Sequence, residues 1–169
     1  ITIDYYLPNK PADVLKLEIL DAHGKIANTF FSDTTGNKMK PTVIDDMNTN
    51  RRLYLVDKSL TNKKGLNRFR WDMTHTGPWH KSKKQRYKNG VAVVPGKYTA
   101  KLYIGDKVAA REFELVADPR LEATNTSLSD IQAQNEIALK ITTLVTEARM
   151  YEDKLNKELK TLKEKTTPE

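Results

Sequence analysis

Five cationic side chains within eight residues give one segment of this sequence a clear potential for chemistry. Lysine and arginine bind phosphate and other anionic groups, and a neighbouring aromatic ring can stack on a base or a sugar. The segment therefore predicts a candidate site for a polyanion, either an acidic glycan or a nucleic acid. Its candidate ligand-binding residues are Trp79, Lys81, Lys83, Lys84, Arg86, Tyr87 and Lys88.

A purely structural interpretation of the same segment competes with polyanion binding. Charged side chains in a loop keep the edge of a nearby β-sheet from pairing with other molecules. Lysine outnumbers arginine here, and no recognised nucleic-acid-binding module surrounds the segment. Polyanion binding is therefore our alternative function rather than our first, and we do not expect nucleic acid as a partner.

The histidines could suggest a metal site, but the sequence supplies too few ligands for one. His75 and His80 lie five residues apart in a loop that contains Gly77 and Pro78, with Asp72 nearby. A protein metal site needs three or four converging ligands and further side chains to orient them. The chain has no cysteine, which excludes disulfides, thiolate ligands and thiol nucleophiles. We expect no metal and no cofactor.

Residues that could catalyse a reaction are equally scarce. Trp71 beside Asp72 could stack on a sugar next to a carboxylate, but a Trp inside an alternating strand usually packs inward. Asp45 and Asp46 are adjacent, so in a strand they would face opposite sides. We find no Ser-His-Asp set, paired carboxylates or glycine-rich phosphate loop in the sequence. We therefore expect that this chain is not an enzyme.

The elements that must position these side chains are short strands separated by turn residues. Val14–Leu20, a turn at Asp21–Gly24 and Lys25–Phe31 predict a β-hairpin, with Gly24 at positive φ. Other segments with strand-like residues are 1–7, 42–44, 53–56, 65–72, 91–94, 97–104 and 108–116. Such spacing is typical of a mainly β protein, here an antiparallel β-sandwich of about seven strands.

The strand at Gly65–Asp72 is expected to fill the centre of the sandwich. Successive side chains of a strand point to opposite faces. We expect Phe69 and Trp71, together with Leu66, to face inward, and the two arginines of the strand to face the solvent. A large Trp near the middle of a chain of short strands suits this role.

Charge and hydropathy limit the remaining classes of protein. The net charge is +7, and the first 118 residues hold twenty-one Lys and Arg against thirteen Asp and Glu. No stretch approaches the roughly 18 apolar residues of a membrane span, so we expect none. Because the chain begins at Ile1 inside a strand-like pattern, we expect it to be a piece of a longer protein.

A different period governs the sequence after Pro119. Ser127, followed three residues later by Asp130, predicts the N-terminus of a long α-helix that continues to about Lys165 without Gly or Pro. Apolar residues then recur at alternating steps of four and three, which is typical of a coiled-coil stripe. They are Ile137, Ile141, Leu144, Ala148, Tyr151, Leu155 and Leu162.

The distal half of this pattern is our candidate interaction surface. A helix of this length spans about 55–60 Å at 1.5 Å per residue, which exceeds the length of a sandwich of short strands. Because an exposed apolar stripe is unfavourable in water, we expect it to be buried against another molecule, for instance in a weak homodimer. The interaction residues are Ala148, Tyr151, Leu155, Leu159 and Leu162.

Three motifs follow one another along the first 118 residues. They are Leu17–Ala22 before the pair Gly24-Lys25, then Gly-x-Asn-x-x-x-Trp-Asp at 65–72, then Pro-Gly-x-Tyr at 95–98. This series resembles the Ig-like domain found in the flagellar hook-capping protein and appended to many secreted bacterial proteins. The resemblance implies an Ig-like β-sandwich over residues 1–118, with a linker and a long helix over residues 119–169.

A second similarity lies around the start of the helix, in Val116–Arg120 and Ser129–Gln134. These segments resemble the C-terminal region of large sortilin-like or BNR-repeat β-propeller proteins, often described as glycosyl-hydrolase-like. The Asp-box repeats of the propeller do not occur, so no activity of the propeller is carried over. The resemblance implies a non-catalytic accessory domain of a larger bacterial protein, packing on an upstream propeller of the same chain or mediating assembly. It also implies a secreted, periplasmic or cell-surface location.

Overall fold

The computed structural model describes residues 1–32, 42–44, 54–56, 59–81, 90–123 and 125–166. By compactness the chain divides into two units. The first, the strand unit, comprises Ile1–His75 and Val93–Pro119, and the second, the helix unit, comprises Thr76–Ala92 and Arg120–Glu169. We expected a division at residue 118, whereas the structure groups Thr76–Ala92 with the C-terminal helix.

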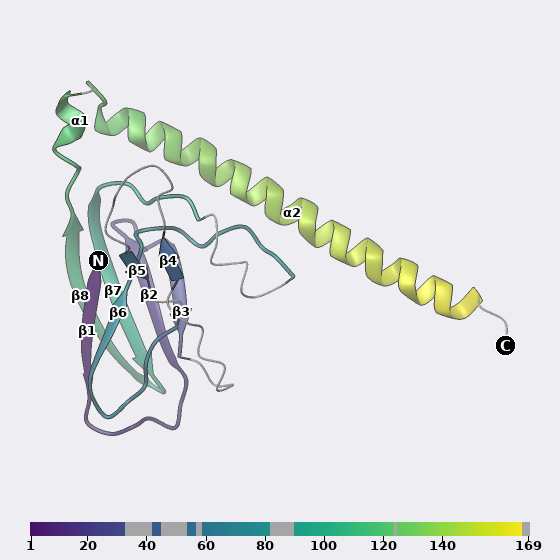
Figure 1. Cartoon of the computed structure of the whole chain (residues 1–169), viewed down its shortest axis with the longest axis horizontal. Coiled ribbons are helices and arrows are strands. Elements are labelled where there is room, and N and C mark those ends of the chain that lie inside the picture. The colour runs from purple at the N-terminus through teal and green to yellow at the C-terminus, as the bar shows by residue number, and fades with distance from the viewer. Residues whose placement is uncertain (33–41, 45–53, 57–58, 82–89, 124, 167–169) are drawn as a thin grey trace. The chain divides into compact units, whose positions relative to one another are not determined.

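The core of the strand unit is built from two antiparallel sheets (Figure 1). One pairs β1 (Thr2–Leu7) with β6 (Gly65–Arg70). The other has the order β3-β2-β7-β8. Its strands are β2 (Leu15–Asp21), β3 (Ile26–Phe31), β7 (Gly96–Ile104) and β8 (Lys107–Leu115). These six strands confirm the mainly β fold.

The described residues also include a separate antiparallel pair, β4 (Thr42–Ile44) and β5 (Tyr54–Val56). Both short strands were expected from the sequence. The expected strand at 91–94 is wrong: Ala92 forms only an isolated bridge, and the Val93 N–H donates to the Met73 carbonyl at 2.9 Å. A run of three valines and an alanine is too short to extend a ladder before Pro95 removes a backbone donor.

The hairpin between β2 and β3 forms as its turn residues predict. Gly24 has a φ of 76°, a conformation that costs glycine little. The Asp21 carboxylate accepts hydrogen bonds from the backbone N–H groups of His23 and Lys25, each at 2.9 Å. A short polar side chain that binds its own turn in this way fixes the reversal of the chain.

Aromatic side chains from both sheets meet in the core. Phe69 and Trp71 are 0% and 2% exposed. The ring of Phe69 lies 4.6 Å from that of Phe30, and Trp71 lies 6.1 Å from Tyr98 in an edge-on arrangement. The Trp71 indole N–H donates to the Thr74 carbonyl, so its polar atom is satisfied inside the unit. The inward assignment of these two residues is confirmed.

The expectation for Leu66 is wrong. Its side chain is 71% exposed, whereas Asn67 is buried. Residues that share a face of a strand are two apart, so Asn67 joins Phe69 and Trp71 inside. The amide of Asn67 accepts from the Lys63 N–H and donates to the Lys63 and Gly65 carbonyls. A buried amide with these partners is satisfied and closes the turn before β6.

The helical region has a short α1 (Arg120–Ala123) and a long α2 (Leu128–Thr166). The 39 residues of α2 confirm the long C-terminal helix, about 58 Å at 1.5 Å per residue. Ser127 Oγ accepts from the Asp130 N–H, and Asp130 Oδ2 accepts from the Ser127 N–H at 2.9 Å. This reciprocal pairing satisfies two backbone donors at the start of α2. The hydrogen bonds from Ser127 lower the pKa of the Asp130 carboxyl.

Candidate functional site: the two faces of α2

Only part of the predicted basic site falls on the described residues. Lys83, Lys84, Arg86, Tyr87 and Lys88 lie outside them, so polyanion binding stays a prediction. Trp79 and Lys81 are described, and both contact α2 within the helix unit. We refer to Thr76–Lys81 as the Trp79 segment.

Both the backbone N–H and the backbone carbonyl of Trp79 form hydrogen bonds with side chains in the middle of α2. Its N–H donates to Thr146 Oγ1 at 3.0 Å, and its carbonyl accepts from Arg149 Nη1 at 3.3 Å. Thr146 can accept this bond because its own hydroxyl donates back to the Thr142 carbonyl at 2.8 Å. The Trp79 segment is therefore fixed to the helix by directional bonds on both polar groups of the Trp79 backbone.

One turn further along α2, an acidic side chain on the same face forms ion pairs with two lysines. Asp153 Oδ2 accepts from Lys157 Nζ at 2.6 Å, and Lys81 Nζ lies 3.4 Å from Oδ1. The Asp153 side chain is only 12% exposed. The hydrogen bond from Lys157, helped by Lys81, lowers the pKa of the Asp153 carboxyl although burial opposes this. Lys81 thus lies beside the protein's own carboxylate, with its side chain 77% exposed.

The covered face of α2 continues toward its N-terminal half. There the Asn135 side-chain amide donates to the carbonyl of Ala92, the last residue of the Thr76–Ala92 part of the helix unit. The half-covered residues recur at steps of one, three and four and are mostly polar or small. They are Ile131, Asn135, Ala138, Leu139, Thr142, Val145, Thr146, Arg149 and Asp153.

This polar face was not predicted from the sequence, because the prediction followed the apolar residues of the helix. A second pattern was present: Thr142, Thr146, Arg149 and Asp153 recur at steps of four, three and four. Such spacing places polar groups on one side of a helix, where a crossing backbone can bind them. The Gly77-Pro78-Trp79 sequence supplies that crossing backbone.

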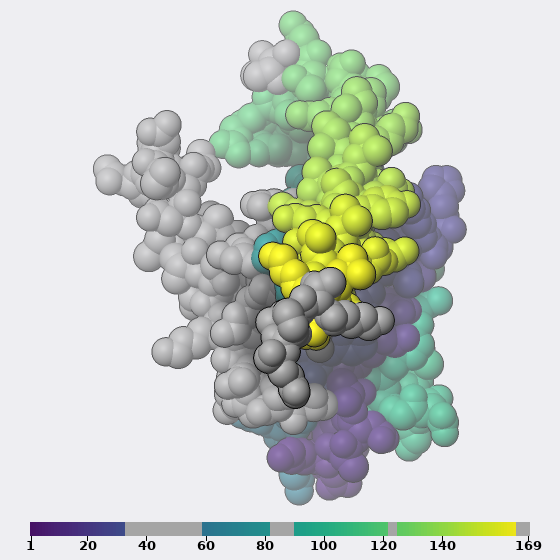
Figure 2. Space-filling view, turned by 90° about the vertical axis from the view of Figure 1, so that its right-hand side faces the viewer, coloured from purple at the N-terminus to yellow at the C-terminus, as the bar shows by residue number. Residues whose placement is uncertain are grey.

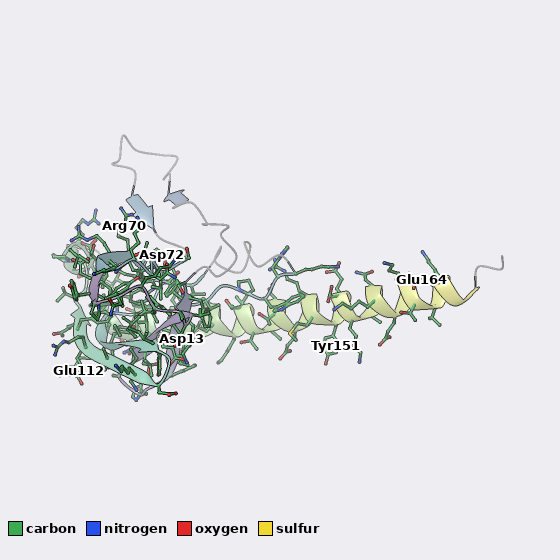
Figure 3. All side chains as sticks on the ribbon, turned by 90° about the horizontal axis from the view of Figure 1, so that it is seen from below. Asp13, Arg70, Asp72, Glu112, Tyr151 and Glu164 are labelled. Carbon is green, nitrogen blue, oxygen red and sulfur yellow. The ribbon has the colours of Figure 1, made fainter. Side chains whose placement is uncertain are left out.

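The apolar stripe predicted from the sequence lies on another side of α2 and is exposed. Tyr151 and Leu155, for example, are 67% and 59% exposed. Figure 2 shows the C-terminal turns of α2 in yellow facing the viewer, and Figure 3 shows Tyr151 projecting from the helix. The exposed stripe, called the α2 stripe below, consists of Ile137, Ile141, Leu144, Ala148, Tyr151, Leu155, Leu159 and Leu162.

A groove separates Trp79 from the α2 stripe. Its volume is about 520 Å³, and Tyr151 and Met150 form part of its apolar wall. Charged side chains complete the lining: Glu147, Asp153, Lys154 and Lys157. The lining thus contains two acidic and two basic side chains, whose formal charges cancel. The groove presents apolar surface with a charged rim of mixed sign.

Neither a metal site nor a sugar-stacking site is supported among the described residues. They contain no group of three or more His, Cys, Asp or Glu side chains that could hold a metal ion. Trp71, the candidate sugar platform, is buried in the core, which confirms the structural interpretation. His75 is half-buried, and burial, with help from the Lys25 charge, lowers the pKa of its imidazole.

Within the described part of the chain, no helix has the length and apolar composition needed to cross a membrane. Searches against protein families, curated proteins and solved structures find no match for this chain.

Proposed function

We propose that the chain is a non-catalytic interaction module that mediates assembly through the α2 stripe. The observation that carries this proposal is the contrast between two sides of one helix. The polar side is bonded to the Trp79 segment, while the apolar side, including Leu144 and Leu155, is more than half exposed. A contiguous apolar surface on a soluble element is typical of a protein-binding site.

The shape of the α2 stripe favours a second helix as its partner. Its core positions recur at steps of four and three from Ile137 to Leu155. This 3.5-residue period produces a narrow seam, which suits knobs-into-holes packing by another helix and suits a flat sheet poorly. The resemblance to propeller-containing proteins offers a propeller as an alternative partner, but nothing in the spacing of the stripe requires one.

The energy available from such a contact is moderate. Burying four large side chains per chain contributes on the order of 6–10 kcal/mol before the costs of association. Such a contact would also stabilise the helical conformation of α2, because most of the stability of a helix in a protein comes from packing of its apolar side. We therefore expect reversible association at micromolar concentrations rather than a permanent complex.

A pair of labelled variants tests which surface becomes covered. The chain lacks cysteine, so Leu155→Cys and Thr143→Cys each create one attachment point for an environment-sensitive dye. Thr143 is exposed and lies outside the α2 stripe. With rising protein concentration we expect the emission of the dye at position 155 to shift to the blue and that at 143 to stay constant. Equal behaviour of the two dyes would contradict the proposal.

A further inference from the structure

We infer that the α2 stripe pairs with the α2 stripe of a second copy, antiparallel, with Ala148 opposite the partner's Tyr151. This inference rests on the proposed function and names its partner and geometry. The register follows from three features of the helix: the sizes of the residues on the stripe, the charges beside it, and the side that the Trp79 segment covers.

Residue size sets the centre of the pairing. Ala148 and Tyr151 are the smallest and the largest side chains of the stripe and are neighbours on it. A two-fold axis between them places each Tyr151 over the partner's Ala148, so a large side chain fills the space that a small one leaves. The next layer outward then joins Leu144 to the partner's Leu155, and the outermost apolar layer joins Ile137 to the partner's Leu162.

One layer in this register is polar. It places Ile141 opposite the partner's Glu158, where a leucine would pack better. The adjacent Leu159 then lies over the partner's Ala138, again a large side chain against a small one. A polar layer within an apolar seam weakens association and favours one register over others.

Charge supports the same register. Glu147 and Lys154 flank one side of the stripe two turns apart. In the antiparallel register Glu147 lies beside the partner's Lys154, and symmetry repeats the pair. A shift by seven residues in one direction sets Glu147 beside the partner's Glu147, and a shift in the other direction sets two copies of Lys154 together. Both shifts therefore exchange attraction for repulsion.

Charge also disfavours the parallel arrangement. In a parallel pair the residue that flanks one layer meets the residue five positions later on the partner. Glu147 would then face the partner's Glu152, twice per dimer. Tyr151 would face its own copy, and Ala148 would leave a gap against the partner's Ala148. The antiparallel arrangement avoids all three conflicts.

The Trp79 segment leaves room for this partner. Thr146 and Asp153, which bind that segment, are each two residues from stripe residues on both sides. Two residues turn a helix by about 200°, so these side chains point away from the stripe. The backbone of the segment therefore bonds to the side of α2 away from the proposed interface, while Trp79 also lines the groove that Tyr151 borders at the edge of the stripe.

Disulfide trapping in the full chain tests the register. Two variants are prepared, Leu144→Cys and Leu155→Cys, in a protein that otherwise has no cysteine. Mixed and oxidised in a glutathione buffer, they should form a crosslink between the two variants and little within either one. In the antiparallel register the two copies of residue 144 lie about 16 Å apart, too far for a disulfide.

Each result of the trapping experiment decides one point. A strong crosslink of Leu144→Cys with itself would overturn the antiparallel pairing while leaving assembly through the stripe intact. Absence of every crosslink, with a protein that stays monomeric, would overturn the proposed function as well. Absence of crosslinks in a protein that still dimerises would overturn the register alone.

Charge reversal provides an independent arm that does not depend on disulfide geometry. Glu147→Lys and Lys154→Glu should each weaken dimerisation by about threefold to tenfold, as expected for exposed ion pairs at an interface. The double variant should regain most of the native affinity, because symmetry pairs the reversed charges again. A double variant as weak as the sum of the single ones would contradict the register.

Discussion

Trp79 and Thr146 are joined by a hydrogen bond of 3.0 Å from the backbone N–H of the first to the side-chain oxygen of the second. They lie 67 residues apart in sequence. Through this bond and its neighbour to Arg149, a segment between β6 and β7 belongs to the helix unit rather than to the strands that flank it. The bond also defines which side of α2 is occupied and which side is free for a partner.

Thr146→Ala should release the Trp79 segment from α2. The substitution removes the acceptor of the Trp79 N–H, and loss of such a bond costs about 0.5–1.5 kcal/mol. We expect the Trp79 amide to exchange with solvent up to about tenfold faster, measured by hydrogen exchange. Thr143→Ala is the matched control, because Thr143 also donates to the carbonyl four residues earlier and has no bond to Trp79 among those described. Equal exchange rates in both variants would contradict the assignment.

Trp71→Ala should destabilise the strand unit by about 3–5 kcal/mol, because it leaves a large cavity between the two sheets. Leu66→Ala, on the same strand but 71% exposed, should change stability by less than about 0.5 kcal/mol. Urea unfolding followed by circular dichroism measures both. Comparable losses in the two variants would contradict the alternation observed along β6.

The stability of the strand unit should fall as the pH drops below about 6.5, in part through His75. Burial and the Lys25 charge lower the pKa of its imidazole in the folded chain, although a bond with the Ala27 backbone and the Asp21 charge oppose this. The unfolded state then binds more protons than the folded state, so the contribution of His75 is fully present above pH 6.5 and is lost toward lower pH.

Comparison with His75→Gln isolates this contribution. Urea unfolding of both proteins between pH 5 and 8 gives the difference in stability as a function of pH. The native chain should lose more stability than the variant on acidification. A difference that is constant with pH, or that favours the native chain at low pH, would show that the imidazole pKa is not lowered.

Retention on heparin should follow net charge rather than the basic segment specifically. Lys83→Gln/Lys84→Gln and Lys160→Gln/Lys163→Gln each remove two positive charges, one pair from the basic segment and one from α2. We expect the two double variants to elute at similar salt concentrations, as non-specific binding of a polyanion depends on the number of cations. A selective loss of retention in the first variant would favour the polyanion-binding function instead.

The sequence was sufficient for the fold class, the hairpin turn and the long helix. Each of these depends on local chemistry: Gly24 at a positive φ, the Ser127–Asp130 pairing, and alternation along β6. Leu66 was misassigned because it was grouped with Trp71 by its apolar character, although its position in the strand has the opposite parity. Side-chain alternation decided the orientation, and hydrophobicity did not.

The contacts of Trp79 could not be predicted from the sequence with the same ease. They join residues about 70 positions apart, and no local pattern encodes that pairing. The exposed α2 stripe, in contrast, was predictable, because heptad spacing depends only on the helical period. The pattern alone did not reveal which side of α2 the chain itself would cover.

Sedimentation velocity over a range of concentrations tests the central claim most directly. The native chain should associate as its concentration rises, and Leu155→Glu should weaken association at least about tenfold, since each chain loses a leucine whose burial is worth about 1.5–3 kcal/mol. Thr143→Glu, a charge of the same kind at an exposed position outside the stripe, should behave like the native chain. A native chain that stays monomeric at every concentration, or a Leu155→Glu variant that associates as strongly as the native chain, would contradict assembly through the α2 stripe.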